Sequence, residues 1–161
     1  RVTPADMAAA DIDHATYHNR VIVPLASITQ ASLRALKYAQ TISDHVIAFN
    51  VSIDEESGKK LEKKYAMLHT KIPLFVKYSP YRQIAQPLLE FIDSEEYNYT
   101  KGDMITVILP EFEVKRQWQH FLHNGTGRFV THQLLKYKHI VVATMPLQLH
   151  DEGLLFGQKK E

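Results

Sequence analysis

Short runs that are apolar at almost every position recur along the chain. Longer segments separate them, in which apolar residues return every three or four positions. A short continuous apolar run rich in β-branched residues predicts a strand that is covered on both faces of a sheet. Five such runs are present, at residues 20–25, 45–51, 73–78, 103–109 and 138–144. The chain is therefore expected to contribute five buried strands.

The segments between these runs carry helical periodicity. Ser27 and Thr29 are candidate helix caps. After them, Leu36, Ala39 and Ile42 lie three positions apart and form one apolar face. A second helix is expected to open at Asp54, because acidic residues in the first turn are favoured by the helix dipole. The order strand, helix, strand is thus repeated from the first run onward.

A third helix is predicted after the run at 73–78. Ser79 followed by Pro80 is typical of an N-cap and a first helical position. Pro87 is expected to kink this helix, because a proline in a helix interior removes one internal hydrogen bond. Two further helices are predicted at residues 114–123 and 127–135.

Alternation of strands and helices predicts an α/β fold, a five-stranded parallel sheet sandwiched by helices with right-handed crossovers. The length of 161 residues suits one domain. Residues 1–19 are expected to form a linker, residues 20–149 the folded domain, and residues 150–161 a flexible tail. The chain begins with Arg1 and not with methionine, so it is expected to be a piece of a longer protein.

Charge and composition exclude several classes of function. Lys and Arg total 19 against 18 Asp and Glu, whereas general DNA or RNA binders carry a larger basic excess. The absence of cysteine removes disulfides, thiolate nucleophiles and cysteine-based metal sites. His120 and His123 have no third ligand at an obvious spacing, so no metal is expected. No apolar run approaches the roughly 20 residues that span a bilayer.

The chain also lacks the signatures of common enzymes. Neither the G-x-S-x-G elbow, nor a Walker A run, nor G-x-G-x-x-G occurs in it. Two acidic residues, Asp103 and Glu111, lie near the expected site, but nothing in the sequence pairs either of them with a base. We therefore expect a binding domain and not an enzyme.

Ligands of open parallel sheets bind outside the carboxyl ends of the strands, where the strand order reverses. This rule selects four loops, at residues 24–29, 50–53, 79–82 and 109–112, and the glycine turn that follows His123 adds polar groups. The candidate ligand-binding residues are Pro24, Leu25, Ala26, Ser27, Thr29, Asn50, Val51, Ser79, Tyr81, Arg82, Pro110, Glu111, Phe112, His123, Asn124, Thr126 and Arg128.

These residues favour an anionic ligand that carries a base. A helix start offers free backbone N–H groups to a phosphate, Arg82 can bind a phosphate with two hydrogen bonds, and Tyr81 can stack on a base. A plainer interpretation stays open for each. Ser27 and Thr29 can be helix caps and nothing more, and Tyr81 and Arg82 can be solvated side chains of a first helical turn.

Several stretches resemble a known family. They are Arg-Val-Ile-Val-Pro from Arg20, Ala-Leu-Lys-Tyr-Ala from Ala35, Ser-Pro-Tyr-Arg from Ser79, and Leu-Pro-Glu-Phe from Leu109 with Trp-Gln-His-Phe-Leu-His-Asn from Trp118. Because of these stretches, residues 19–149 resemble the cytosolic C-terminal domain of bacterial amino acid–polyamine–organocation superfamily permeases, which include the KUP-type potassium importers.

The resemblance implies a universal-stress-protein-like fold and a homodimeric regulatory domain on the cytoplasmic face of the bacterial plasma membrane. The transmembrane permease domain would precede Arg1 in the same chain. The implied ligand is cyclic di-AMP. Its phosphates would be held near Ala26, Ser27 and Arg82, and its adenine would pack against Pro24, Val51 and Pro110, with His123, Asn124 and Thr126 closing the rim.

Two alternatives stay open beside this interpretation. Universal stress proteins bind ATP through a G-x-x-G…G-S/T signature, and the segment after the fourth predicted strand lacks its first glycine pair. This departure argues against ATP and is compatible with a different adenine nucleotide, and an ATP-binding stress-type protein is kept as the second hypothesis. A domain that only dimerises a transporter and binds no ligand is the third.

Overall fold

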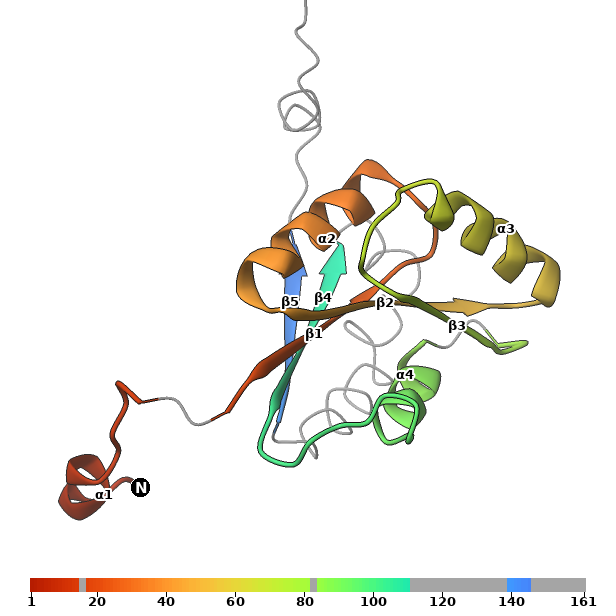
Figure 1. Cartoon of the computed structure of the whole chain (residues 1–161). Helices are drawn as coiled ribbons and strands as arrows, with labels where there is room; N and C mark the ends of the chain where they lie inside the picture. Colours follow the sequence, from red (N-terminus) through yellow and green to blue (C-terminus); the bar gives the residue numbers. More distant parts are fainter. Residues whose placement is uncertain (15–16, 82–83, 111–138, 146–161) are drawn as a thin grey trace, which may run out of the picture.

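Five parallel strands form the central sheet of the computed structural model, in the order β3-β2-β1-β4-β5 (Figure 1). Residues 1–14, 17–81, 84–110 and 139–145 are described by the structure. The strands are β1 (Asn19–Pro24), β2 (His45–Ser52), β3 (Leu74–Tyr78), β4 (Met104–Pro110) and β5 (Ile140–Met145). The predicted α/β fold with a five-stranded parallel sheet is confirmed, and each strand lies within two residues of its predicted bounds.

The strand order reverses between β1 and β4. The chain first runs outward from β1 to β2 and β3, and then returns past β1 to form β4 and β5. Ile22 stands in register with Ile47 of β2 on one side and with Val107 of β4 on the other, so β1 is covered by neighbours along both edges. The β1–β4 boundary is the topological switch point of the sheet.

Helices lie on both faces of the sheet (Figure 1). One face carries α2 (Gln30–Ile42) and α3 (Glu55–Ala66), and the other carries α4 (Ala85–Ile92). The helices predicted at 114–123 and 127–135, and the tail at 150–161, lie outside the described residues. Among the helices that the structure describes, none is long and apolar enough to cross a membrane.

Each face of the sheet has its own apolar cluster because side chains alternate along a strand. Val21 and Val23 of β1 point to the α2 face, where they pack with Ala35, Leu36 and other buried residues. Ile22, between them, points to the α4 face. Burial of each such side chain stabilises the fold by about 1.5–3 kcal/mol. The alternation of one strand thus holds helices on both sides.

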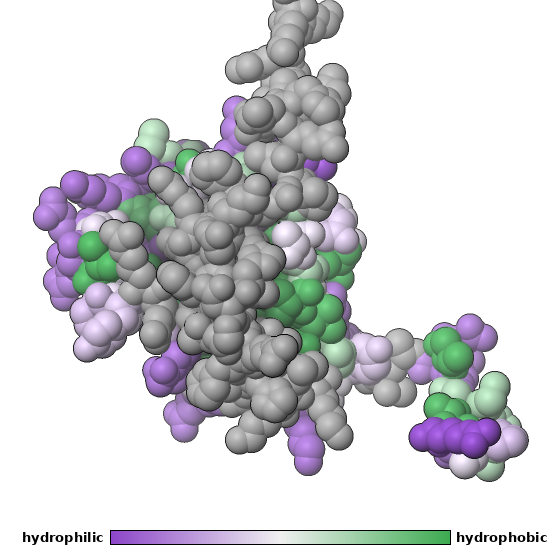
Figure 2. All heavy atoms as spheres, turned by 180° about the vertical axis from the view of Figure 1, so that it is seen from behind, coloured by the Kyte–Doolittle hydropathy of each residue, from purple (hydrophilic) through white to green (hydrophobic). Residues whose placement is uncertain are grey.

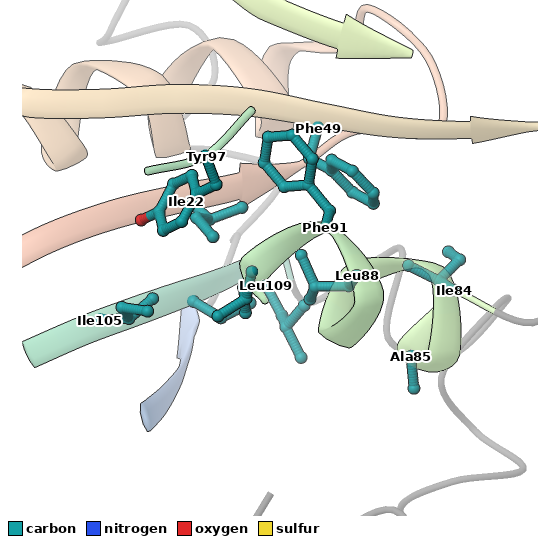
Figure 3. Close-up of a cluster of buried hydrophobic side chains, with 11 residues drawn as sticks. Ile22, Phe49, Ile84, Ala85, Leu88, Phe91, Tyr97, Ile105 and Leu109 are labelled. Atoms are coloured by element: carbon teal, nitrogen blue, oxygen red, sulfur yellow. The ribbon is translucent and has the colours of Figure 1, made fainter. Parts of the chain in front are cut away.

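The cluster under α4 is centred on Phe91 (Figure 3). Its ring lies 5.0 Å from the ring of Phe49, 5.0 Å from that of Phe75 and 5.3 Å from that of Tyr97, all in tilted arrangements. Tilted aromatic pairs add attraction beyond the burial of area. Phe91 thereby ties α4 to β2 and β3 and to the segment that precedes β4.

Two helix starts agree with their predicted capping chemistry. Of the candidate caps Ser27 and Thr29, Thr29 is the N-cap of α2, and it forms a capping box with Ser32. Asp54 caps α3 as predicted, with Glu55 and Glu56 in the first turn. Hydrogen bonds from Ser57 lower the pKa of the exposed Asp54 carboxyl.

The prediction that a helix begins at Ser79 and Pro80 is wrong. The backbone N–H of Ser79 donates to the carbonyl of Ser52 at 2.9 Å, which extends the β2–β3 pairing, and α4 begins at Ala85 after an N-cap at Ile84. Pro87 is consequently the third residue of the helix. A proline in the first turn removes no internal hydrogen bond, so the reason for the expected kink disappears.

The N-terminal segment contains one helical turn that its sequence did not predict. The helix α1 (Pro4–Ala8) is capped by Thr3, which forms a capping box with Asp6. All of its residues are exposed, and Figure 2 shows this segment standing apart from the body of the molecule. The expected role of residues 1–19 as a linker stays a prediction.

Candidate ligand site at the carboxyl ends of the strands

A chain of hydrogen bonds joins the carboxyl ends of β3, β2 and β1. The Ser79 N–H donates to the Ser52 carbonyl, the Ser52 hydroxyl donates to Asn50 Oδ1 at 2.6 Å, and Asn50 Nδ2 donates to the Leu25 carbonyl at 2.6 Å. The Leu25 N–H in turn donates to the carbonyl of Phe49 at 2.7 Å. These bonds fix the position at which each of the three strands turns into its loop.

Asn50 was predicted to bind ligand, but in the structure its side chain is hydrogen-bonded to other parts of the protein. Its side chain is 3 % exposed, and both ends of its amide are used by Leu25 and Ser52. A buried polar group without partners costs about 1–3 kcal/mol, so this pairing is required. Sequence reasoning missed Ser52. Its place two residues after Asn50 on the same face of a strand was the available signal.

The turn after β1 has a buried half and an exposed half. Pro24 and Leu25 are buried, Ala26 is half-buried and Ser27 is exposed. Thr29 accepts from the Ser32 N–H at 3.1 Å and donates its own N–H to the Ser32 hydroxyl at 2.7 Å. Thr29 is thus engaged in capping α2, as the plainer interpretation holds, and Ala26 and Ser27 lie at the surface in front of the helix.

The three residues expected to contact adenine are not presented together. Val51 packs against the cluster under α4, whereas Pro110 follows Ile108 on the α2 face of β4. Pro24 and Pro110 are also buried. A contact of adenine with these buried prolines stays a prediction.

The other predicted site residues divide into two groups. Ser79 and Tyr81 follow β3 at the surface, with the Tyr81 ring 72 % exposed. The remaining predicted residues lie outside the described part of the chain; they are Arg82, Glu111, Phe112, His123, Asn124, Thr126 and Arg128.

A hollow of about 520 Å³ lies between the end of β3 and α4. Its lining consists of Lys77, Tyr78, Ser79, Tyr81, Gln86, Pro87, Glu90, Phe91, Ser94 and Glu96. We call it the β3–α4 groove. Ser79 and Tyr81 belong to it, so two predicted residues share one concave surface with side chains from α4.

Sequence reasoning missed the α4 side of this groove. Gln86 and Glu90 are exposed polar residues on a helix, and such residues carry no signal until the helix has been placed. Their spacing of one turn was the available hint, because residues four apart share a helix face. The predicted helix start at Ser79 also placed Tyr81 in the helix, whereas the structure places it across the groove from α4.

The tyrosines with raised pKa values lie away from this edge of the sheet. Burial raises the pKa of Tyr65 and of Tyr97 to about 12. Tyr65 donates its hydroxyl to the carbonyl of Ile72, just before β3. The guanidinium of Arg20 stacks over the Tyr97 ring at 4.1 Å and donates to the Tyr97 carbonyl. Both tyrosines therefore stabilise the amino ends of the strands.

Metal binding finds no support in the described part of the chain, where no three histidine or acidic side chains gather in the manner of a metal site. The described carboxyl edge offers backbone groups, hydroxyls, one amide, exposed tyrosine and carboxylates. This chemistry can bind a polar ligand. The fold is that of an open parallel α/β domain, a class of proteins in which ligands usually bind at the carboxyl ends of the strands.

Comparison with known proteins narrows this class to a family. Residues 16–147 match the model of the KimA potassium transporter C-terminal domain, and the chain belongs to this family. It is 35 % identical over 127 residues to the potassium transporter KimA of Bacillus subtilis (strain 168). The alignment covers 78 % of this chain and 21 % of that protein, so the chain spans about a fifth of the length of this curated relative.

Proposed function

We propose that this chain is the regulatory domain of a membrane protein that transports potassium, and that it controls transport by binding cyclic di-AMP. Membership of the transporter C-terminal domain family across residues 16–147 is the observation that carries the proposal. The membrane-embedded part precedes Arg1 in the same polypeptide and belongs to the amino acid–polyamine–organocation superfamily. The domain lies on the cytoplasmic face, has a universal-stress-protein-like fold and is not an enzyme.

The carboxyl edge of the sheet supports a nucleotide ligand. Cyclic di-AMP carries two phosphate charges and two adenines. The exposed surface at Ala26 and Ser27 stands in front of the N-terminus of α2, whose partial positive charge attracts a phosphate. Arg82 follows directly in the chain after Tyr81 and supplies a cation that can pair with the second phosphate.

A homodimer fits the symmetry of this ligand. A two-fold axis presents the same surface of both copies, and cyclic di-AMP is itself two-fold symmetric. The edge strand β5 supports self-association, because Val141 is 46 % exposed and Val142 is 40 % exposed there. An edge strand with exposed valines is a surface that a second copy can cover.

Regulation follows from linkage. A ligand shifts a transporter between states only if it binds one state more tightly than the other. We propose that the ligand selects one arrangement of the two domains, and that residues 1–19 transmit it to the membrane part.

Calorimetric titration of the purified chain tests the ligand. Cyclic di-AMP is expected to bind, with ATP and cyclic di-GMP as controls that bind weakly or not at all. Binding of ATP alone, with turnover in the presence of Mg²⁺, would replace the proposal by the stress-protein hypothesis. If none of the three nucleotides produces heat of binding, the remaining hypothesis would be a domain that only dimerises the transporter.

The transport step needs the full-length protein. Reconstituted into vesicles, it is expected to take up potassium, and cyclic di-AMP on the domain side is expected to change the uptake rate. If the chain binds cyclic di-AMP in solution but the nucleotide does not change the uptake rate, the proposed regulatory role would be wrong and the proposed binding would stand.

A further inference from the structure

The β3–α4 groove has the dimensions of a small-molecule site. Its volume of about 520 Å³ falls within the roughly 300–1,000 Å³ that is usual for ligand pockets. It lies beside the carboxyl end of β3, and Ser79 on its rim is bonded to the end of β2. The groove therefore continues the carboxyl edge at which the proposed nucleotide binds.

The lining offers an apolar surface for a flat ring. Phe91, only 2 % exposed, and Pro87 contribute to the lining, and the exposed Tyr81 ring also belongs to it. The Lys77 ammonium lies 5.6 Å from the centre of the Phe91 ring and forms an ion pair with Glu96. The positive charge of Lys77 is thereby neutralised inside the groove. Phe91 forms the buried floor of the groove, and the exposed Tyr81 is the aromatic side chain that can stack on a nucleobase.

One side of the groove accepts hydrogen bonds. Gln86 Nε2 donates to Glu90 Oε1 at 3.3 Å across one turn of α4. Within the described part of the chain the second carboxylate oxygen of Glu90 has no hydrogen-bond partner, so it can accept from a ligand donor. One lysine stands against two glutamates in the lining, so the groove repels phosphate. It favours a neutral, flat group that carries an N–H donor.

Adenine has this chemistry, and we propose that the β3–α4 groove is the base subsite of the nucleotide. Glu90 accepts from the exocyclic amine of adenine, and Tyr81 packs on its ring. The Glu90 carboxylate is proposed to face position 6 of the purine. There guanine and hypoxanthine present a carbonyl oxygen where adenine has the amine, and this oxygen faces the carboxylate unfavourably. Glu90 is thus the residue that selects adenine. The inference rests on the proposed function and adds to it the site and the basis of base choice.

The groove and the turn after β1 are within reach of one ligand. β3 and β1 are separated by β2, which is two strand spacings or about 10 Å. A base in the groove and a phosphate in front of α2 then belong to the same dinucleotide. The negatively charged groove would hold the neutral base, and the positive N-terminal end of α2 would hold the phosphate.

The test compares cyclic di-AMP with its inosine analogue, in which carbonyl oxygens replace the two amines. The wild-type chain is expected to bind cyclic di-AMP at least about tenfold more tightly than the analogue. In Glu90→Gln the amide can present either an acceptor or a donor, so the preference is expected to fall to about threefold or less. Titration calorimetry gives both dissociation constants.

Glu62→Gln is the matched control. Glu62 is an exposed glutamate on α3, on the opposite face of the sheet, and its substitution changes the net charge by the same amount. It is expected to keep the wild-type preference. Tyr81→Leu is expected to weaken both ligands by about tenfold through lost stacking, without a change in their ratio.

The outcomes separate the two proposals. A wild-type preference that persists in Glu90→Gln would overturn the assignment of the groove and leave cyclic di-AMP sensing intact. Failure of the wild-type chain to bind cyclic di-AMP would overturn the proposed function and the groove assignment together. Because both side chains are exposed, equal melting temperatures of all variants confirm that folding does not cause the effect.

Discussion

Two buried tyrosines differ in whether their hydroxyl has a hydrogen-bond acceptor, and this difference decides how each hydroxyl affects the stability of the fold. Tyr65 and Tyr97 are both 5–7 % exposed. The Tyr65 hydroxyl donates to the Ile72 carbonyl at 2.7 Å, whereas the Tyr97 hydroxyl is buried with no hydrogen-bond partner among the described residues. A buried donor without an acceptor costs free energy, and removing it costs none.

Tyr65→Phe is therefore expected to lower the free energy of unfolding by about 1–2 kcal/mol, because it leaves the Ile72 carbonyl unpaired. Tyr97→Phe is expected to leave the stability unchanged or to raise it by up to about 1 kcal/mol, while the Arg20 guanidinium keeps a ring to stack on. Urea denaturation of the three proteins measures both differences. An equal loss in both variants would contradict this account.

Asn50 and Glu90 show how far single residues could be assigned from the sequence. Asn50 was a candidate ligand residue because it lies in the segment 50–53, at the carboxyl end of the second predicted strand. The structure uses both ends of that amide internally. Glu90 attracted no attention, since one exposed glutamate on a helix resembles any other. Its proposed role depends on Tyr81 and Lys77, which line the same groove from outside α4.

At the scale of elements, the sequence predicted best where one physical effect dominates. The strands were correct because a strand covered on both faces must be apolar throughout. The start of α3 was correct because Asp54 bonds within its own turn. The start of α4 was not, because the fate of Ser79 depends on the Ser52 carbonyl of another strand, and no local pattern contains that bond.

The contact between α3 and β3 carries a prediction of its own. A methyl group added at Gly58 would stand 2.7 Å from the Tyr78 hydroxyl oxygen and 2.8 Å from Cε1 of its ring. Tyr78 is 47 % exposed at the end of β3, so its ring can swing outward. Alanine in a helix interior is worth up to about 1 kcal/mol over glycine.

Gly58→Ala is accordingly expected to stabilise the wild-type chain by less than about 1 kcal/mol, and to give the full gain when Tyr78→Ala has removed the ring. A double-mutant cycle in urea measures the coupling between the two positions. Equal effects of Gly58→Ala with and without the Tyr78 ring would show that the ring does not press on the helix.

For the whole molecule, the two buried tyrosines set the behaviour at alkaline pH. Their pKa values are about 12 in the folded chain, against about 10 for an ordinary tyrosine. Above pH 10 the unfolded chain loses the tyrosine protons that the folded chain retains, so the free energy of unfolding falls as the pH rises from 10 to 12. Below pH 10 this contribution is fully present.

Each tyrosine is expected to account for at most about 2 kcal/mol of that loss. Chemical denaturation at pH 9 and pH 11 measures it. Lysines also titrate in this range, and the double variant Tyr65→Phe with Tyr97→Phe separates the two contributions, because it is expected to lose distinctly less stability than wild type over the same interval. Identical losses would assign the alkaline sensitivity to other groups.

The proposed homodimer makes the largest-scale prediction, and the edge strand β5 is the place to test it. Val141 and Val142 are exposed there and stand at the end of the strand order. A carboxylate at an interface without a partner is costly to bury, whereas on a free surface it costs little. Val142→Glu is therefore expected to shift the chain toward monomer in sedimentation equilibrium with no loss of folding.

Val2→Glu is the control, since Val2 is 68 % exposed and directly precedes the cap of α1, a helix that stands apart from the sheet (Figure 1). It is expected to leave the association unchanged. If cyclic di-AMP binds across the two-fold axis, Val142→Glu also weakens its binding, and added ligand drives the variant back toward dimer by mass action. A monomeric variant that binds the nucleotide with unchanged affinity would place one complete site within each chain and separate sensing from dimerisation.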